Sequence, residues 1–242
     1  MTRNFSFWVL AGCASLVTPA AMAGVCDARF MHDGGAVQLT GSGNLKLGAD
    51  LGFTEVSKTD SANCRARVQG TAMFSYAGLP ASQSKLDYLM TIKQGQATFV
   101  RYAQAGEQPR SEGQFDLRML GLFAYDRQIT GQGQRMPGAT YRLNIGKEAP
   151  VGGQPSTVVR IGEKTVGAKA SLDTALGRQS CWPIRYSRDT DPTMATFKGL
   201  TLPIPGMKTT VTDWYCPDVS LVMRQDIDQS GVKSAVEITQ VR

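Results

Sequence analysis

The clearest chemical pattern in the sequence is a segment near its C-terminal end that has the spacing of a calcium-binding loop. Asp226, Asp228 and Glu237 occupy the first, third and twelfth positions of this pattern, and Ser230 occupies the fifth. Gly231, at the sixth position, would permit the sharp turn that such a loop needs. Oxygen atoms at this spacing could surround a calcium ion.

The residues around this pattern favour a hairpin over a metal site. Lys233 stands where such loops usually carry a branched apolar residue, and the flanks alternate as strands do. A hairpin turning at Ser230-Gly231 would place Glu237 on the return strand, away from Asp226. We therefore predict no metal at Asp226, Asp228, Ser230 and Glu237.

The sequence offers few other residues for catalysis. His32 is the single histidine and lies among polar and glycine residues, as is typical of a loop. No nucleophile elbow, phosphate-binding loop or dinucleotide-binding glycine pattern is present in the sequence. Asp189 and Asp191 could act as an acid–base pair, but Pro192 indicates a turn there. We expect a protein without a cofactor and lean towards a non-enzymatic role, with a hydrolase that lacks a recognisable motif as the alternative.

Cysteine residues give a firmer prediction. Apart from Cys13, the chain has four cysteines, an even number that is typical of disulfides in an oxidising compartment: Cys26, Cys64, Cys181 and Cys216. Three pairings are possible. We favour Cys26–Cys64 and Cys181–Cys216, because each bridge then lies within one half of the chain. A metal site fits poorly, since the sequence contains no C-x-x-C motif.

Residues 1–23 have the composition of an export signal. Arg3 precedes an apolar run, and Ala21-Met22-Ala23 is a small-x-small cleavage site before Gly24. We expect a periplasmic protein without a transmembrane span, because the apolar run is too short to cross a bilayer comfortably. Alternatively, Leu10-Ala11-Gly12-Cys13 fits a lipobox, in which an acylated Cys13 would anchor a lipoprotein to the membrane.

Composition limits the remaining function classes. The chain has 242 residues, of which 42% are hydrophobic, and a formal net charge of +6. This hydrophobic content is enough for a substantial core, as one large β domain or two small ones. The basic residues are scattered, which argues against a nucleic-acid-binding surface.

Alternating residues and turn signals predict an all-β fold. Residues 65–76 alternate, with Val68 and Ala72 on one side of a strand. Two pairs of short strands flank glycine-containing turns and predict hairpins, at Gln94-Gly95 and at Gly162-Glu163. Sustained helical periodicity is absent, and one short helix is expected between Phe115 and Tyr125. We predict a curved antiparallel sheet with at most one or two short helices.

The best internal boundary is the Pro- and Gly-rich stretch 147–155. It would separate an N-terminal β-rich half, residues 24–146, from a C-terminal part, residues 156–242. The same stretch could instead be a long loop within one continuous domain, residues 24–242.

The last third of the chain carries three features in a recognisable order. A strand at Ser180–Tyr186 follows a tight turn at Leu176-Gly177, and an aromatic block spans Val211–Val222. A closing hairpin follows at Met223–Arg242. This order resembles the C-terminal half of uncharacterised exported Gram-negative envelope proteins with a W-Y-x-P-x-V-G-L-V block, which are similar to the half-barrel lipoprotein carriers LolA and LolB. This sequence has Ser220 where the block usually has glycine.

The resemblance implies an incomplete barrel whose concave face holds acyl chains. We therefore expect a periplasmic binding or carrier module for an apolar, lipid-like or acylated ligand. A Cys181–Cys216 bridge would hold Trp182 near Trp214, so we expect Trp182, Trp214 and Tyr215 to line the ligand site, or else to be core residues. The alternative function is a structural or assembly factor that binds an envelope protein through the edges of its sheet.

Overall fold

A computed structural model describes residues 24–76, 82–94, 96–101, 121–123, 125, 129–144, 156–197 and 200–242. The predicted export signal with Cys13, the boundary at 147–155 and most of the expected helix at 115–125 lie outside these residues. Leu122 and Phe123 form a turn, and the short element Val25–Asp27 (η1) is a 3-10 helix. Within the described part of the chain, no helix is long and apolar enough to span a bilayer.

One large antiparallel sheet dominates the structure. Its strands follow the order β5-β4-β3-β2-β1-β16-β15-β14-β11-β8-β7. The pairing of β1 with β16 is the seam between the two halves of this order. On one side of the seam the strands are β1 (Ala36–Gly43), β2 (Leu45–Asp60), β3 (Asn63–Tyr76), β4 (Ser82–Lys93) and β5 (Gln96–Arg101). On the other they are β16 (Val232–Val241), β15 (Leu221–Gln229), β14 (Met207–Cys216), β11 (Gly177–Thr190), β8 (Ser156–Ile161) and β7 (Ala139–Asn144).

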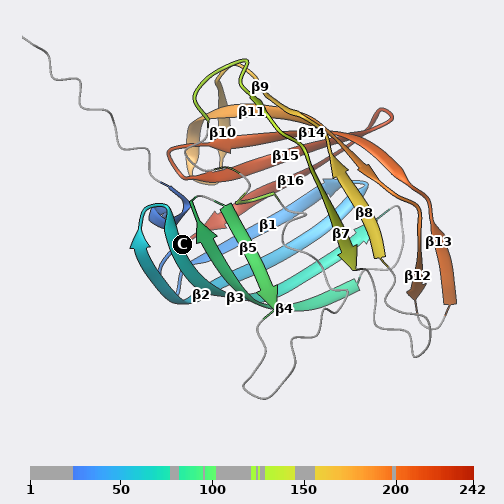
Figure 1. Ribbon diagram of the computed structural model, residues 1–242, viewed down its shortest axis with the longest axis horizontal. Helices are drawn as coiled ribbons and strands as arrows, with labels where there is room; N and C mark the ends of the chain where they lie inside the picture. Colours follow the sequence, from blue (N-terminus) through green and yellow to red (C-terminus); the bar gives the residue numbers. More distant parts are fainter. Residues whose placement is uncertain are drawn as a thin grey trace, which may run out of the picture.

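The sheet curves so that its two ends form facing walls (Figure 1). Its path ends at β5 on one side and β7 on the other, and the pairings are antiparallel throughout. The prediction of an all-β, curved antiparallel sheet is confirmed. A separate hairpin, β12 (Thr193–Phe197) with β13 (Leu200–Ile204), extends from the end of β11.

At the seam, the strand that comes first in the sequence, β1, pairs with the strand that comes last, β16. Ala36 and Arg242 exchange backbone hydrogen bonds of 3.0 and 2.9 Å, which pin the end of the chain to the start of β1. β7, which precedes residues 147–155, pairs with β8, which follows them. The sheet therefore continues across the predicted boundary.

The hairpin predicted at Gly162-Glu163 is wrong. β8, β9 (Lys164–Val166) and β10 (Ala170–Thr174) follow one another along the same edge of β11, and β8 and β9 do not pair with each other. The chain turns back only after Thr174, which pairs with Gly177. By contrast, the hairpin at Gln94-Gly95 is confirmed, because Lys93 pairs with Gln96.

Most buried apolar residues of the described chain form two clusters. The larger one contains a group of aromatic rings, in which Phe30 lies 4.9 Å from Phe53 and 5.7 Å from Phe123, centroid to centroid. In the smaller cluster, Tyr125 and Ile129 pack against Ile184 of β11 and Tyr215 of β14. Tyr125, Ile129 and Met136 thus cover part of one face of β11, β14 and β15.

Candidate functional site

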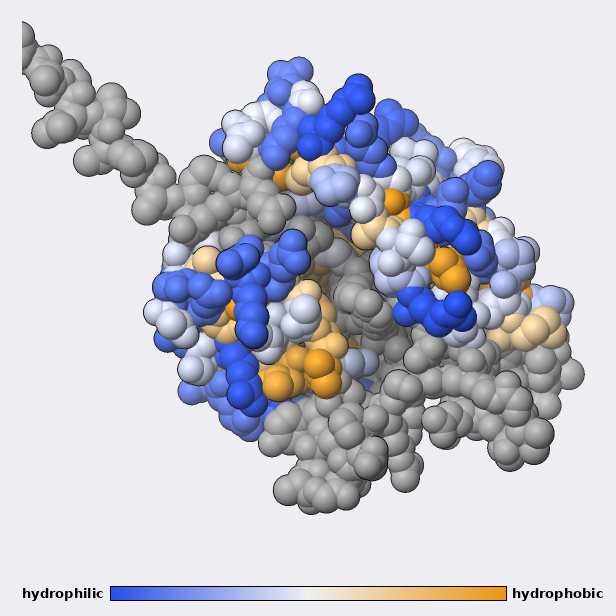
Figure 2. All heavy atoms as spheres, in the orientation of Figure 1, coloured by the Kyte–Doolittle hydropathy of each residue, from blue (hydrophilic) through white to orange (hydrophobic). Residues whose placement is uncertain are grey.

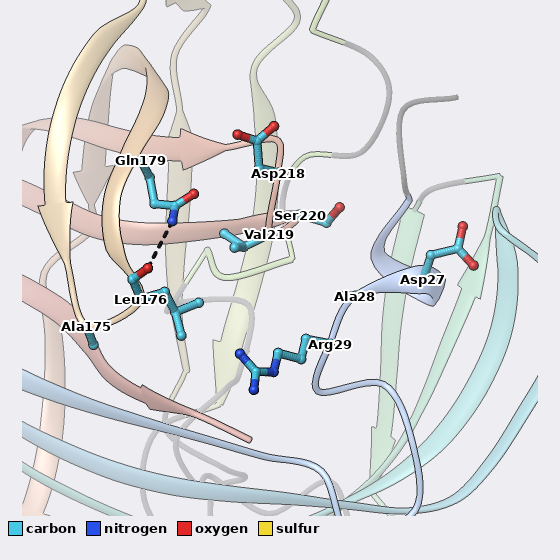
Figure 3. A pocket seen from close by; sticks show the side chains of 9 residues that line it. All are labelled: Asp27, Ala28, Arg29, Ala175, Leu176, Gln179, Asp218, Val219 and Ser220. Atoms are coloured by element: carbon cyan, nitrogen blue, oxygen red, sulfur yellow. Dashed lines mark hydrogen bonds between the residues drawn. The ribbon is translucent and has the colours of Figure 1, made fainter. Parts of the chain in front are cut away.

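A cleft of about 570 Å³ opens between η1 and two turns of the C-terminal strands. Figure 3 shows its lining, which comes from η1 and the residues after it, from the β10–β11 turn and from the β14–β15 turn: Asp27, Ala28, Arg29, Ala175, Leu176, Gln179, Asp218, Val219 and Ser220. Polar and apolar side chains share this lining. Its volume falls in the range of small-molecule sites, about 300–1,000 Å³.

Each wall of the cleft is held by a disulfide. Cys26, next to Asp27, is bonded to Cys64 of β3, and Cys216, two residues before Asp218, is bonded to Cys181 of β11. All four cysteines are buried, and both bridges have the pairing predicted from the sequence. The bridges restrict movement of both walls and so preorganise the cleft.

The β14–β15 turn has an unusual backbone conformation at Ser220. Pro217, which has no N–H to donate, follows the last residue of β14, and Ser220 donates its N–H to the Pro217 carbonyl at 3.2 Å. Ser220 is buried and has φ +54°, in the left-handed region that favours glycine. Glycine would adopt this conformation without the strain that a side chain adds.

The cleft contains charged side chains of both signs. Arg29 extends from the η1 side towards Leu176, while the Asp218 carboxylate lies on the β14–β15 turn (Figure 3). Neither Arg29 nor Asp218 forms an ion pair or side-chain hydrogen bond with the residues that the structure describes. The arrangement can accept a ligand through charged and apolar contacts together.

A second group of polar side chains surrounds Asp213 of β14, which is fully buried. Its carboxylate accepts hydrogen bonds from the Tyr125 hydroxyl at 2.7 Å, the Gln225 amide at 2.7 Å and the Tyr186 hydroxyl at 3.3 Å. The Lys164 ammonium donates to the Tyr125 hydroxyl at 3.1 Å and lies 4.4 Å from the centre of its ring. Tyr125 therefore links a lysine to a buried aspartate.

Burial shifts the ionisation of this cluster. Desolvation raises the pKa of Asp213, although nearby Lys164 and the three hydrogen bonds oppose the shift. Desolvation and then the charge of Asp213 raise the pKa of Tyr125 and of Tyr186 well above the ordinary value. Desolvation lowers the pKa of Lys164. The hydrogen bond from Tyr125 to Asp213 holds Tyr125 against β14.

Strand geometry brings this cluster together. Asp213 pairs with Ile184 on β11 and with Gln225 on β15, so Gln225 shares its face of the sheet. The sequence did not lead us to predict this buried cluster around Asp213. A signal was present, because Asp213 stands between Val211 and Tyr215 on the buried face of an alternating strand, where a carboxylate requires partners.

The three predicted ligand-binding aromatics do not form one surface. Trp182 pairs with Tyr215 and Trp214 with Pro183, so the two tryptophans lie on opposite faces of the sheet. Trp214 packs against the larger cluster and donates its indole N–H to Asp226 at 2.8 Å. Trp182 and Tyr215 belong to the smaller cluster. All three lie outside the cleft lining.

Residues of the calcium-loop pattern have partners within the hairpin. The ion pairs of Arg224 engage Asp226 at 2.7 Å and Glu237 at 3.0 Å. Asp228 accepts the N–H of Gly231, and the chain turns at Ser230-Gly231, both with positive φ. In the part of the chain that the structure describes, no group of acidic, histidine or cysteine residues is placed to hold a metal.

The other catalytic candidates are also accounted for. His32 is exposed and its Nδ1 lies 2.9 Å from the Asp33 carbonyl oxygen. Asp191 forms a two-point ion pair with Arg160 after the end of β11. Its neighbour Asp189 lies in the paired part of β11, opposite Lys208. The structure does not bring His32 together with the two aspartates in a shared site.

No family model matches the chain, and no curated protein matches its sequence. Solved structures similar to this chain include an exported protein of Bacteroides fragilis described as having a YmcC-like fold, at 12% identity and a TM-score of 0.48, covering 89% of this chain and 99% of that one. A lipoprotein from Parabacteroides distasonis has 11% identity and a TM-score of 0.47, covering 88% and 96%. The Escherichia coli lipoprotein YmcC has 10% identity and a TM-score of 0.33, covering 85% and 84%.

Proposed function

We propose that this chain is a non-enzymatic binding or carrier module of the bacterial periplasm, and that the cleft beside η1 takes a lipid-like ligand. The observation that carries the proposal is the cleft itself, a cavity of about 570 Å³ whose two walls are each fixed by a disulfide. A preorganised wall favours binding because less conformational freedom is lost when the ligand enters.

The position of the cleft changes where the ligand is expected. An open half-barrel would hold acyl chains on its concave face, but Tyr125, Ile129 and Met136 cover part of that face over β11, β14 and β15. The described surface in Figure 2 is predominantly hydrophilic, with small separate apolar patches. Leu176 and Val219 offer apolar contact within the cleft, so a ligand with one apolar part fits there.

A filling substitution tests the proposal. Leu176→Trp should occupy the cleft and abolish saturable binding of an uncharged apolar dye to the purified, oxidised protein. Val232→Trp is the matched control, because Val232 is 47% exposed on β16 and lies outside the cleft. Equal dye binding by wild type and Leu176→Trp would show that the cleft is not the ligand site.

A second candidate function is an assembly factor that binds an envelope protein by adding a strand to the sheet. It is supported by the two end strands, β5 and β7, and by Val100 of β5, which is 55% exposed. Strand addition would use backbone groups at a sheet edge and would be insensitive to Leu176→Trp. Val100→Pro would weaken the binding of a partner strand to β5, whereas Val100→Pro should leave dye binding to the cleft intact.

A further inference from the structure

The cleft is lined by one cation, Arg29, and two anions, Asp27 and Asp218, of which Asp27 has a partner of its own. Some exposed arginines of the described chain pair with nearby acids, as Arg178 does with Asp173 at 3.1 Å, whereas Arg65 and Arg185 form no ion pair with described residues. Arg29 and Asp218 both line the cleft and form no such pair with described residues. Two opposite charges held apart by anchored walls leave the space between them for a ligand.

The two charges come from different walls. Arg29 follows η1, which the Cys26–Cys64 bridge fixes, and Asp218 lies in the turn fixed by the Cys181–Cys216 bridge. Each residue is within three positions of a disulfide, so neither wall can readily close to let the side chains meet. Between them, Leu176 and Val219 provide the apolar part of the lining.

We infer that the ligand is a zwitterionic amphiphile that carries a phosphate and a primary ammonium group. This inference rests on the proposed function. Arg29 meets the phosphate, because a guanidinium donates two parallel hydrogen bonds to phosphate oxygens. Asp218 meets the ammonium group, and the apolar part of the ligand lies against Leu176 and Val219. An ethanolamine phospholipid and free phosphoethanolamine share this head-group chemistry.

Four probes with the same oxidised protein test the inference by isothermal titration calorimetry. Three carry the same pair of six-carbon acyl chains: phosphatidylethanolamine, phosphatidylglycerol and uncharged diacylglycerol. The fourth is free phosphoethanolamine. We expect phosphatidylethanolamine to bind most tightly and phosphatidylglycerol to bind less tightly, since it lacks the ammonium group. Free phosphoethanolamine should bind weakly, because it lacks the apolar chains.

Charge-removing variants give the decisive pattern. Arg29→Gln should lower the affinity for phosphatidylethanolamine and for phosphatidylglycerol about fivefold, as expected for the loss of one partly solvated charge contact. Asp218→Asn should weaken phosphatidylethanolamine by a similar factor and leave phosphatidylglycerol unchanged or tighter. Arg178→Gln and Asp173→Asn are matched controls. This exposed pair lies on the β10–β11 hairpin, which supplies Leu176 to the cleft, but neither residue of the pair lines the cleft.

The possible failures are distinguishable. Equal binding of all three lipids, with no effect of either charge variant, would overturn the inference and leave the proposed binding function intact. If free phosphoethanolamine bound as tightly as phosphatidylethanolamine, the inference that the ligand is an amphiphile would be overturned, and the ligand would be a soluble molecule. No binding of any probe, including the uncharged lipid and the apolar dye, would overturn both.

Discussion

Tyr125 donates a 2.7 Å hydrogen bond to Asp213, a residue 88 positions further along the chain. This contact joins Tyr125 to β14, where the carboxylate is fully buried. Gly121 packs close to the same group, since a Cβ added there would lie 3.2 Å from the Gln225 amide nitrogen and 3.8 Å from an Asp213 oxygen. The cluster therefore decides how the inner face of the sheet is covered.

The first prediction concerns the worth of this buried acceptor. Asp213→Ala would leave the hydroxyls of Tyr125 and Tyr186 and the amide of Gln225 without their acceptor, at a cost of about 3–5 kcal/mol. Urea denaturation measures the change in unfolding free energy. Asp173→Ala, at an exposed strand position, should change it by less than about 0.5 kcal/mol. A loss below about 1 kcal/mol for Asp213→Ala would contradict this role.

The second prediction is the pH dependence of stability. Burial raises the pKa of Asp213 in the folded protein above the unfolded value near 4, so the folded state binds this proton more tightly. The favourable contribution of protonated Asp213 to the free energy of unfolding is therefore fully present below pH 4 and is lost as pH rises through the raised pKa of Asp213. Asp213→Asn imitates the protonated side chain. Relative to this variant, wild type should lose stability between pH 4 and 7 in urea titrations, and a flat or rising difference would refute the assignment.

The third prediction concerns the strained turn beside the cleft. Ser220→Gly should stabilise the protein by about 0.5–1 kcal/mol, because glycine adopts positive φ freely and the gain exceeds its extra entropy in the unfolded chain. Thermal and urea unfolding measure the change. Ser171→Gly, on β10, should instead destabilise by about 0.5–1 kcal/mol, since no positive φ is required there. A destabilising Ser220→Gly would mean that the Ser220 side chain contributes more than its strain costs.

The features that the sequence predicted correctly depend on local or covalent constraints. The turn at Ser230-Gly231 follows from two neighbouring residues that tolerate positive φ, and both have it, at 53° and 88°. Alternation placed Val68 and Ala72 on a buried face of β3, where both are buried. The disulfide pairing followed from the position of each cysteine in one half of the chain.

The features that were missed depend on contacts between distant strands. Gly162 resembled a turn residue, but its φ is not positive, and a Cβ there would lie 2.4 Å from the Ser187 hydroxyl of β11. Gly167 likewise would meet the Pro183 ring at 2.9 Å. These glycines allow close packing against β11 and do not mark hairpins. The lining of the cleft had no signal, because η1 and the two turns are distant in sequence.

The separation of Trp182 from Trp214 has the same origin. A bridge between Cys181 and Cys216 fixes the strands side by side, and the next residue on each strand points to the opposite face. Trp182 follows Cys181, so it lies opposite to the cystine, whereas Trp214 is two residues before Cys216 and lies on the same face as the cystine. Counting residues from the bridge would have placed the two indoles apart.

The last prediction tests whether the bridges hold the cleft in shape. Replacing Cys181 and Cys216 together by alanine removes a link between residues 35 positions apart, which should cost about 4 kcal/mol of stability in the loop-entropy model. The Cys26 and Cys64 double replacement, at a separation of 38, should cost a similar amount. Each change also frees one wall, so affinity for the apolar dye should fall in both variants.

Stability and affinity must be measured separately for this test. Urea unfolding gives the stability of each double variant, and dye titration at a temperature where each variant is fully folded gives its affinity. Leu172→Ala is the control, since Leu172 packs against the larger cluster without lining the cleft, so it should lower stability and leave affinity unchanged. Double variants that lose stability but retain wild-type affinity would show that the bridges stabilise the fold without preorganising the cleft.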